Sequence, residues 1–85
     1  MQFEWDENKR KENLDKHGVD FRHAAQIFNA PFLTEIDHRK DYGEVRFRAF
    51  GTYNGMSLCV IFTIRENCIR IISAWRGRQK ENESA

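Results

Sequence analysis

The sequence predicts an α+β fold in which two N-terminal helices pack on one face of a small antiparallel β-sheet, in the order β-α-α-(β)-β-β-β. Three observations support this class. The 85 residues leave room for one domain, apolar residues recur at helical spacing in the first third, and an Asn-Gly turn joins two alternating runs in the second half. Hydrophobic residues make up 40% of the chain and charged residues 32%, as in globular proteins.

Composition excludes a membrane span. The longest apolar run, residues 58–62, is far shorter than the roughly 20 residues that a membrane helix needs. Residues 1–6 contain acids where a signal peptide has a basic start and an apolar stretch. We therefore expect a cytoplasmic protein.

The chain begins with a strand and a helix. Residues 2–5 alternate between polar and apolar side chains, which favours a short, half-buried strand. A helix follows over residues 6–17, because Asp6 is a suitable N-cap and Gly18 a suitable stop. Its one large apolar side chain is Leu14, so polar contacts to the sheet edge must help to hold it.

A second helix is predicted from Asp20, another N-cap, to Asn29. Apolar side chains recur along it at helical spacing, at Phe21, Ala24, Ala25 and Phe28. Residues 32–34 form a possible short strand, and residues 35–43 form a polar loop.

The second half predicts three antiparallel strands. Residues 45–53 and 56–64 flank Asn54-Gly55, which is typical of a type I′ hairpin turn. The resulting register gives one face without charged residues, which we expect to form the core. A third strand, residues 68–74, follows a two-residue turn, which keeps Arg70 out of the core.

The opposite face carries basic side chains that this register brings together. Arg46, Thr63 and Arg70 lie side by side, and the next row holds Arg48, Ile61 and Ile72, with Phe50 nearby. Guanidinium groups and an aromatic ring suit RNA phosphates and bases. The alternative is that these are ordinary solvent-facing strand residues. Charge favours an anionic partner, because residues 44–80 contain seven Lys and Arg against two Asp and Glu.

Neither a metal site nor a cofactor is predicted. The register separates Cys59 from Cys68 by roughly 20 Å, and the three histidines lack the spacing of zinc ligands. Simple alternation along the last strand places Trp75 on the core side.

Lys9, Asn13 and His17 form one stripe along the first helix. A histidine titrates near neutral pH, so His17 can carry a proton in catalysis. The alternative is that the stripe is a solvated face, with His17 as a cation at the helix C-terminus.

Several segments resemble one family of proteins. They are Phe3–Lys9 at the start, Asn13–Phe21 and Ala25–Phe28 in the helical region, and Gly43–Phe47 and Ile69–Ala74 in the strands. In combination they resemble BrnT, the toxin of a bacterial type II toxin–antitoxin pair. The resemblance covers residues 3 to about 81.

This resemblance implies a RelE-like fold, as a single domain over residues 1–85. The residue pattern itself predicts that residues 76–85 form a basic and then acidic turn, short helix or tail. The resemblance also implies an endoribonuclease that halts translation, and a ribbon-helix-helix antitoxin partner of the BrnA type. The carried-over catalytic positions are Lys9, His17, Arg46 and Arg70. Family members often carry arginine after Ser-Ala, where this chain has Trp75. Either the basic role there passes to Arg76 or Arg78, or it is weakened in this chain.

A metal-independent ribonuclease needs a base for the 2′-hydroxyl, an acid for the leaving oxygen and cations for the transition state. Arg46 and Arg70 are the predicted phosphate-stabilising groups, and His17 or Lys9 is the base or acid. The predicted RNA-binding residues are Arg48, Phe50, Arg76 and Arg78. Two alternatives are a non-catalytic RNA- or protein-binding module and a structural partner completed by another chain.

Overall fold

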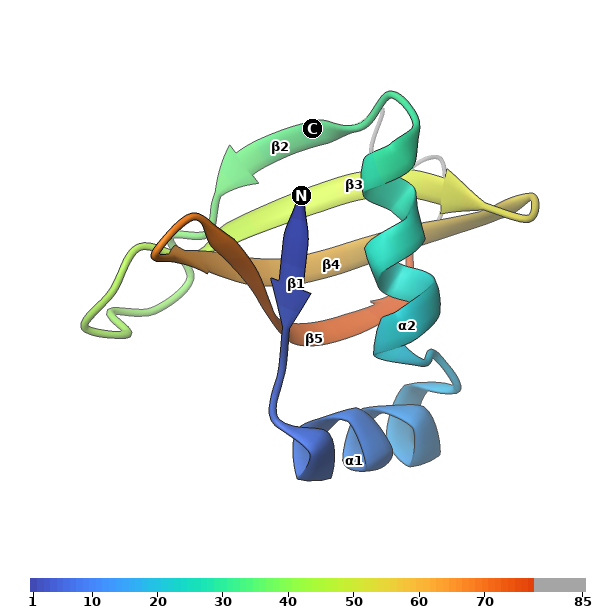
Figure 1. Cartoon of the computed structure of the whole chain (residues 1–85), viewed down its shortest axis with the longest axis horizontal. Coiled ribbons are helices and arrows are strands. Elements are labelled where there is room, and N and C mark those ends of the chain that lie inside the picture. The colour runs from blue at the N-terminus through green and yellow to red at the C-terminus, as the bar shows by residue number, and fades with distance from the viewer. Residues whose placement is uncertain (78–85) are drawn as a thin grey trace.

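A computed structural model describes residues 1–77, which form a five-stranded sheet in the order β1-β5-β4-β3-β2 (Figure 1). The elements are β1 (Gln2–Glu4), α1 (Glu7–His17), α2 (Phe21–Ala24), the 3₁₀ helix η1 (Ala25–Asn29), β2 (Leu33–Ile36), β3 (Phe47–Tyr53), β4 (Met56–Arg65) and β5 (Cys68–Arg76). The α+β class is therefore confirmed. Most of the C-terminal segment predicted over residues 76–85 lies outside the described residues, as does Arg78. No helix within residues 1–77 is long and apolar enough to cross a membrane.

The sheet is mixed, which corrects the prediction of an antiparallel one. Strand β1 runs parallel to β5, with Phe3 opposite Ile69 and Glu4 opposite Arg70. The other neighbouring strands are antiparallel. A parallel pairing between two ends of a chain involves no tight turn, so no local sequence signal marks it.

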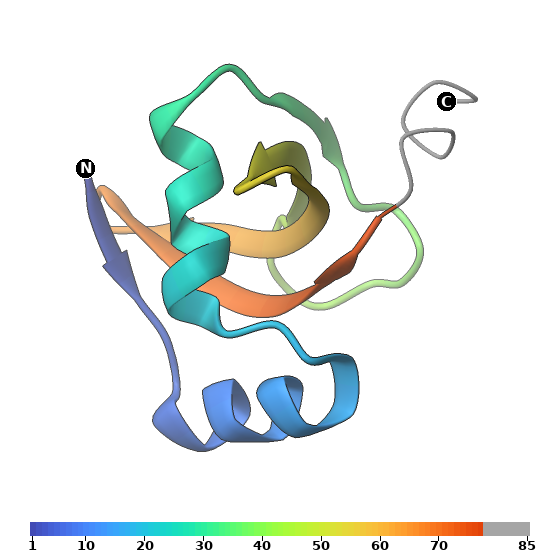
Figure 2. The same ribbon diagram turned by 90° about the vertical axis from the view of Figure 1, so that its right-hand side faces the viewer.

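One face of the sheet is covered by α2 and η1 (Figure 2). These two elements replace the single predicted helix, and the predicted apolar positions are buried. The largest fully buried side chains are Phe21, Ile27, Leu58, Val60 and Ile71. Gly51 lets η1 approach closely, because a Cβ there would lie 3.0 Å from Cβ of Ile27.

The predicted hairpin register is confirmed from the turn to Phe47, but residues 45 and 46, which were predicted as strand, lie in the loop before β3. Tyr53 lies opposite Met56, and pairing continues to Phe47 opposite Phe62. Asn54 and Gly55 have φ values of 49° and 76°, which a type I′ turn requires at both central positions.

The predicted register between β4 and β5 holds only over the first part of the pair. It runs from Arg65 opposite Cys68 to Phe62 opposite Ile71, and then a β-bulge shifts it by one residue. Ile61 therefore faces Ser73 instead of Ile72.

The bulge also reverses the faces of the residues that follow. Ala74 turns into the core, where it is fully buried, and Trp75 lies opposite Cys59 on the other face. The prediction that Trp75 points to the core is therefore wrong, because one extra residue inverts the alternation of every later side chain.

Helix α1 lies along the outer edge of β5 rather than on the sheet face (Figure 2). Its buried residue is Asn13, whereas Leu14 is 41% exposed. The Asn13 amide donates to the carbonyl of Ala74 at 2.7 Å and accepts from the Ala74 N–H at 3.1 Å. It also donates to the carbonyl of Val19 at 2.9 Å. The expected polar contacts to the sheet edge are thus confirmed, and Asn13 makes them.

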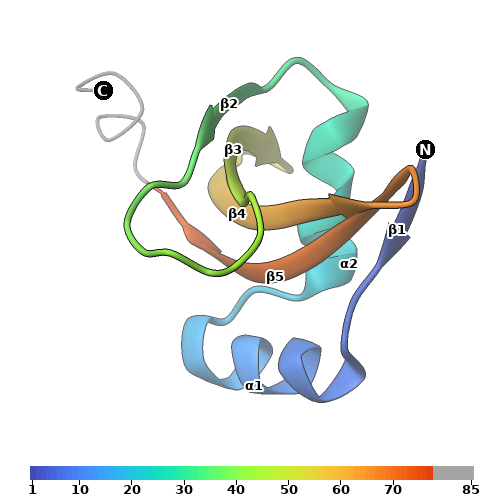
Figure 3. The same ribbon diagram turned by 90° about the vertical axis from the view of Figure 1, so that its left-hand side faces the viewer.

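The second face of the sheet is partly covered. The segment between β2 and β3, residues 37–46, bends over it (Figure 3). Ile61 and Cys59 are consequently 3% and 2% exposed. The carboxylate of Asp37 organises this loop: it is buried and accepts hydrogen bonds from the Arg39 backbone and guanidinium and from the Tyr42 hydroxyl.

A second buried carboxylate, Asp20, joins the two helices. It caps α2 by accepting from the N–H of Arg22, and it forms an ion pair of 3.0 Å with Arg10 of α1. Hydrogen bonding to the Arg22 side chain lowers the pKa of Asp20 to about 2. The Arg39 side chain likewise lowers the pKa of Asp37 to about 2.

Replacing Asn13 with alanine should destabilise the fold by about 2–4 kcal/mol, because the Ala74 backbone and the Val19 carbonyl lose their partners in a buried place. Denaturant unfolding measures this change. Asn8→Ala, at an exposed position of the same helix, should change the free energy of unfolding by no more than about 0.5 kcal/mol. Equal stabilities of the two variants would contradict the role given to Asn13.

Stability should fall in acid below about pH 4. A carboxylate with a lowered folded-state pKa contributes fully above its ordinary value of 3.8, and this contribution is lost as the pH falls towards 2. Asp20 and Asp37 should each contribute about 2 kcal/mol. Unfolding measured from pH 7 to pH 2 tests this. Asp20→Asn should reduce the loss of stability between pH 4 and pH 2. An unchanged loss would rule out Asp20 as one of its sources.

Candidate active site

Three of the four predicted catalytic residues line one small hollow at the junction of α1, β5 and the loop before β3. Lys9 comes from α1, Arg46 from the end of the loop, and Arg70 from β5. We call this the arginine hollow. Its other lining residues are Asp6, Glu44, Arg65, Ile71 and Ile72. Four basic side chains thus surround two acidic ones, which favours an anionic ligand.

Arg46 is held in place by a chain of contacts that starts in the protein interior. The buried Asp37 accepts from the Tyr42 hydroxyl at 3.3 Å, and the Arg46 guanidinium stacks over the Tyr42 ring at 4.0 Å. The backbone closes the same loop, because the Asp37 N–H donates to the carbonyl of Arg46 at 2.8 Å. A side chain in the middle of the loop therefore aims Arg46 into the hollow.

Arg70 is positioned by the sheet. Its cross-strand partner is Thr63, as predicted, and its guanidinium forms an ion pair of 3.1 Å with Glu4 on β1. The Thr63 hydroxyl donates to the carbonyl of Val45 at 2.7 Å, which ties β4 to the residue just before Arg46. The two arginines are thus linked through one buried threonine.

Glu44 lies between two guanidinium groups in the hollow. It forms ion pairs of 3.2 Å with Arg46 and 3.1 Å with Arg65. The hydrogen bond from Arg65, together with that from Arg46, lowers the pKa of Glu44 below its ordinary value, so the carboxylate stays ionised near neutral pH.

His17 does not share the hollow with Arg46 and Arg70. It lies eight residues after Lys9 on α1, which corresponds to about 12 Å along the helix. It lines an adjoining hollow that contains both Lys9 and Ile72. The grouping of His17 with the arginines at one catalytic centre is therefore not supported by the geometry.

Arg76 lies farther along β5, beside His17. With Lys16, His17 and Trp75 it lines an open hollow, which we call the aromatic hollow. The Arg76 guanidinium also contacts the sulfur of Met56 at 3.0 Å. The bulge in β5 is what brings Trp75 to this surface.

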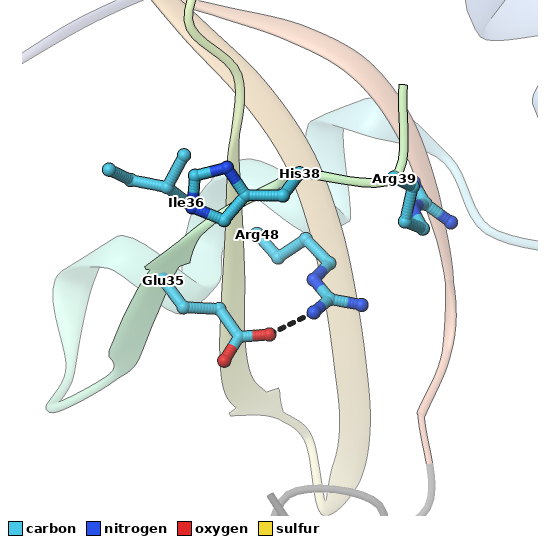
Figure 4. Close-up of a pocket in the computed structure, with 5 residues that line it drawn as sticks. All are labelled: Glu35, Ile36, His38, Arg39 and Arg48. Atoms are coloured by element: carbon cyan, nitrogen blue, oxygen red, sulfur yellow. Dashed lines mark hydrogen bonds and ion pairs between the residues drawn. The ribbon is translucent and has the colours of Figure 1, made fainter. Parts of the chain in front are cut away.

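Arg48 and Phe50 lie apart from the arginine hollow, on β3. Arg48 lines a separate hollow with Glu35, Ile36, His38 and Arg39, and it is ion-paired with Glu35 (Figure 4). The Arg48 guanidinium lies 5.9 Å from the centre of the Phe50 ring. These two predicted RNA-binding residues therefore lie close to each other, but they do not line the arginine hollow with the predicted catalytic residues.

Sequence reasoning missed the acidic partners, Glu4 and Glu44, and the aromatic support from Tyr42. Glu44 stands two residues before Arg46, so the sequence itself indicated that these two side chains lie close together. The pairing of Glu4 with Arg70 had none, because it depends on the parallel placement of β1. Within residues 1–77, no three His, Cys, Asp or Glu side chains gather closely enough to hold a metal ion.

Comparison with known proteins agrees with the resemblance. The family described as the ribonuclease toxin BrnT of type II toxin–antitoxin systems matches residues 5–81. Comparison with curated proteins gives no match. Among solved structures, the chain is similar to the crystal structure of the Brucella abortus ribonuclease toxin BrnT, with 30% sequence identity and a TM-score of 0.68. The similarity covers 93% of this chain and 99% of the Brucella chain.

The family match includes Lys9, Arg46 and Arg70, the three predicted catalytic residues that line the arginine hollow, and most of the fold around them. The chain belongs to the BrnT family of ribonuclease toxins of type II toxin–antitoxin systems.

Proposed function

We propose that this chain is a metal-independent endoribonuclease that inhibits translation by cleaving RNA, and that cleavage takes place in the arginine hollow. The observation that carries the proposal is the convergence of Lys9, Arg46 and Arg70 from three separate segments of the chain. A basic hollow with both proton-carrying and charge-stabilising groups is what such a reaction needs.

In the proposed reaction, the 2′-hydroxyl of one nucleotide attacks the adjacent phosphorus. A bond forms between phosphorus and the 2′-oxygen, and the bond to the 5′-oxygen of the next nucleotide breaks. Negative charge grows on the phosphoryl oxygens, where the planar forks of Arg46 and Arg70 stabilise it.

Two groups of the arginine hollow serve the proton transfers in this proposal. Glu44, whose carboxylate lines the hollow, accepts the proton of the 2′-hydroxyl. Lys9 supplies a proton to the leaving 5′-oxygen. Lys9 takes this role rather than His17, because it lines the hollow in which both arginines lie.

Membership of a type II toxin–antitoxin family implies an antitoxin partner. We propose that this partner is a BrnA-like ribbon-helix-helix protein, that it blocks access of RNA to the toxin, and that the toxin acts in the cytoplasm. The abundance of basic side chains around the hollows supports RNA as the molecule that the antitoxin must exclude.

Replacing Arg46 or Arg70 with alanine should lower RNA cleavage by about 10²- to 10³-fold, because each removes a positioned cation from the transition state. The fold should persist, since the carboxylate partners Glu44 and Glu4 are themselves 27% and 41% exposed. Lysine at either position should restore only part of the activity, because an ammonium lacks the planar fork. A cleavage assay on a defined single-stranded RNA in EDTA, with a thermal melt of each variant, measures both effects.

Lys11→Ala is the matched control, because Lys11 is an exposed cation of α1 that does not line the hollow. Lys9→Arg separates charge from proton transfer, because arginine keeps the charge but does not release a proton in proteins. Cleavage by both alanine variants at the rate of the unaltered protein would remove the arginine hollow from the mechanism. RNA binding without cleavage by the unaltered protein would favour the non-catalytic module.

Expression of the chain alone should arrest bacterial growth, and co-expression of a neighbouring ribbon-helix-helix protein should restore it. The expected reason is that the partner prevents RNA from reaching the arginine hollow. Growth curves with inducible expression measure this, with an Arg46→Ala, Arg70→Ala double variant as the control for expression burden. Normal growth with abundant unaltered protein and no partner would contradict the toxin assignment to this chain.

A further inference from the structure

The aromatic hollow differs in composition from the other hollows of this surface. Its described lining consists of Lys16, His17, Arg76 and the half-buried Trp75, without a carboxylate. The arginine hollow contains Asp6 and Glu44, the hollow between it and the aromatic hollow contains Glu12, and that around Arg48 contains Glu35. An aromatic ring among unopposed basic groups suits a ligand that has both a flat ring and negative charge.

Trp75 has basic side chains around its ring system. The centre of the His17 imidazole lies 6.1 Å from that of the indole, at an angle of 47°. The Arg39 guanidinium, which the buried Asp37 anchors, lies 5.6 Å from the indole centre. The indole is thus fixed by neighbours from α1 and from the loop of residues 37–46, while its hollow remains open.

The aromatic hollow connects to the arginine hollow through shared residues. It shares Lys16 and His17 with the intermediate hollow on α1, which in turn shares Lys9 and Ile72 with the arginine hollow. Trp75 lies five positions after Arg70 on β5, a distance of about 15 Å along the strand. This distance exceeds the length of one nucleotide. An RNA strand that is cleaved beside Arg70 can therefore continue along α1 and place a later base at Trp75.

We propose that Trp75 is a stacking platform for an unpaired base of single-stranded RNA, and that Lys16, His17 and Arg76 bind the phosphates beside that base. This inference rests on the proposed function for the identity of the nucleic acid. Stacking on an aromatic ring tolerates different bases and requires an unpaired one. The site therefore selects single-stranded RNA over duplex and sets where along the strand cleavage occurs.

The test uses a fluorescein-labelled single-stranded RNA with 2′-O-methyl groups throughout, which lacks the attacking hydroxyl and cannot be cleaved by the proposed reaction. Fluorescence anisotropy measures its binding to the full chain. Trp75→Ala should weaken binding by about 10- to 100-fold, and Trp75→Phe should retain much of the affinity. Trp75→Leu keeps apolar volume without an aromatic face and should bind as weakly as Trp75→Ala. Tyr53→Ala, which removes an aromatic ring at the hairpin end of β3, should bind like the unaltered protein.

A set of RNAs with a single abasic position identifies the stacked base. The unaltered protein should lose affinity at one position along the strand, and Trp75→Ala should lose nothing further at that position. In a Trp5→Phe background, Trp75 is the remaining tryptophan, and its fluorescence should be quenched by the intact RNA but less by the RNA that lacks the stacked base.

Binding by Trp75→Ala and Trp75→Leu equal to that of the unaltered protein would overturn the proposal, as would the absence of any sensitive abasic position. Because the probe cannot be cleaved, these results are independent of catalysis. Trp75-dependent binding without cleavage of ordinary RNA would uphold the stacking site and reject the ribonuclease activity. If Trp75→Ala changed neither the binding nor the cleavage of RNA, the ribonuclease activity would stand and the stacking site would be rejected.

Discussion

The pairing of the Asn13 amide with the backbone of Ala74 is the interaction on which the arrangement of the site depends. A side-chain amide can present a donor and an acceptor together, as a peptide group does, and so Asn13 pairs with Ala74 in place of a neighbouring strand where β1 ends. An unpaired strand edge is a liability in a small protein, and here a helix covers it. Because Asn13 fixes α1 against β5, Lys9 reaches the same hollow as Arg70.

The bulge at Ile72 is the second feature that organises this surface. It places the small Ala74 in the core and presents Trp75 on the other side of the strand. Ile72 itself lines both the arginine hollow and the hollow next to it. One inserted residue therefore separates a site rich in paired charges from one that is aromatic and basic.

Local chemistry explains which features could be predicted from the sequence. The Asn54-Gly55 turn and the caps at Asp6, Gly18 and Asp20 act over a few residues, and each predicted element boundary near them is close to the observed one. The register predicted from the hairpin brought Arg46 and Arg70 together, while the family resemblance added Lys9. Features that depend on contacts between residues far apart in the sequence could not be predicted from such local signals.

Those distant features are the parallel placement of β1, the bulge, and the loop that covers the second face. The pattern rules assign a side chain to a face but do not state when a strand gains a residue, so Trp75 was placed on the wrong side. They also treat asparagine as a surface residue, whereas Asn13 is buried by partners that come together only in the folded chain. His17 shared the helical stripe with Lys9, but two turns of helix separate it from Lys9, and it lines a different hollow from Arg46 and Arg70.

The ion pairs of Arg46 with Glu44 and of Arg70 with Glu4 give the hollow a particular thermodynamic character. Both guanidinium groups already hold an anion, so the arrival of a phosphate is an exchange of one anionic partner for another. The rotamers of two long side chains are restricted when the protein folds, and less conformational entropy remains to be lost on binding. Each carboxylate contacts its guanidinium through one oxygen, whereas a phosphate can present two oxygens to the planar fork and a simple halide cannot. If the hollow binds RNA as proposed, an exchange of this kind would make it select its ligand by shape as well as by charge.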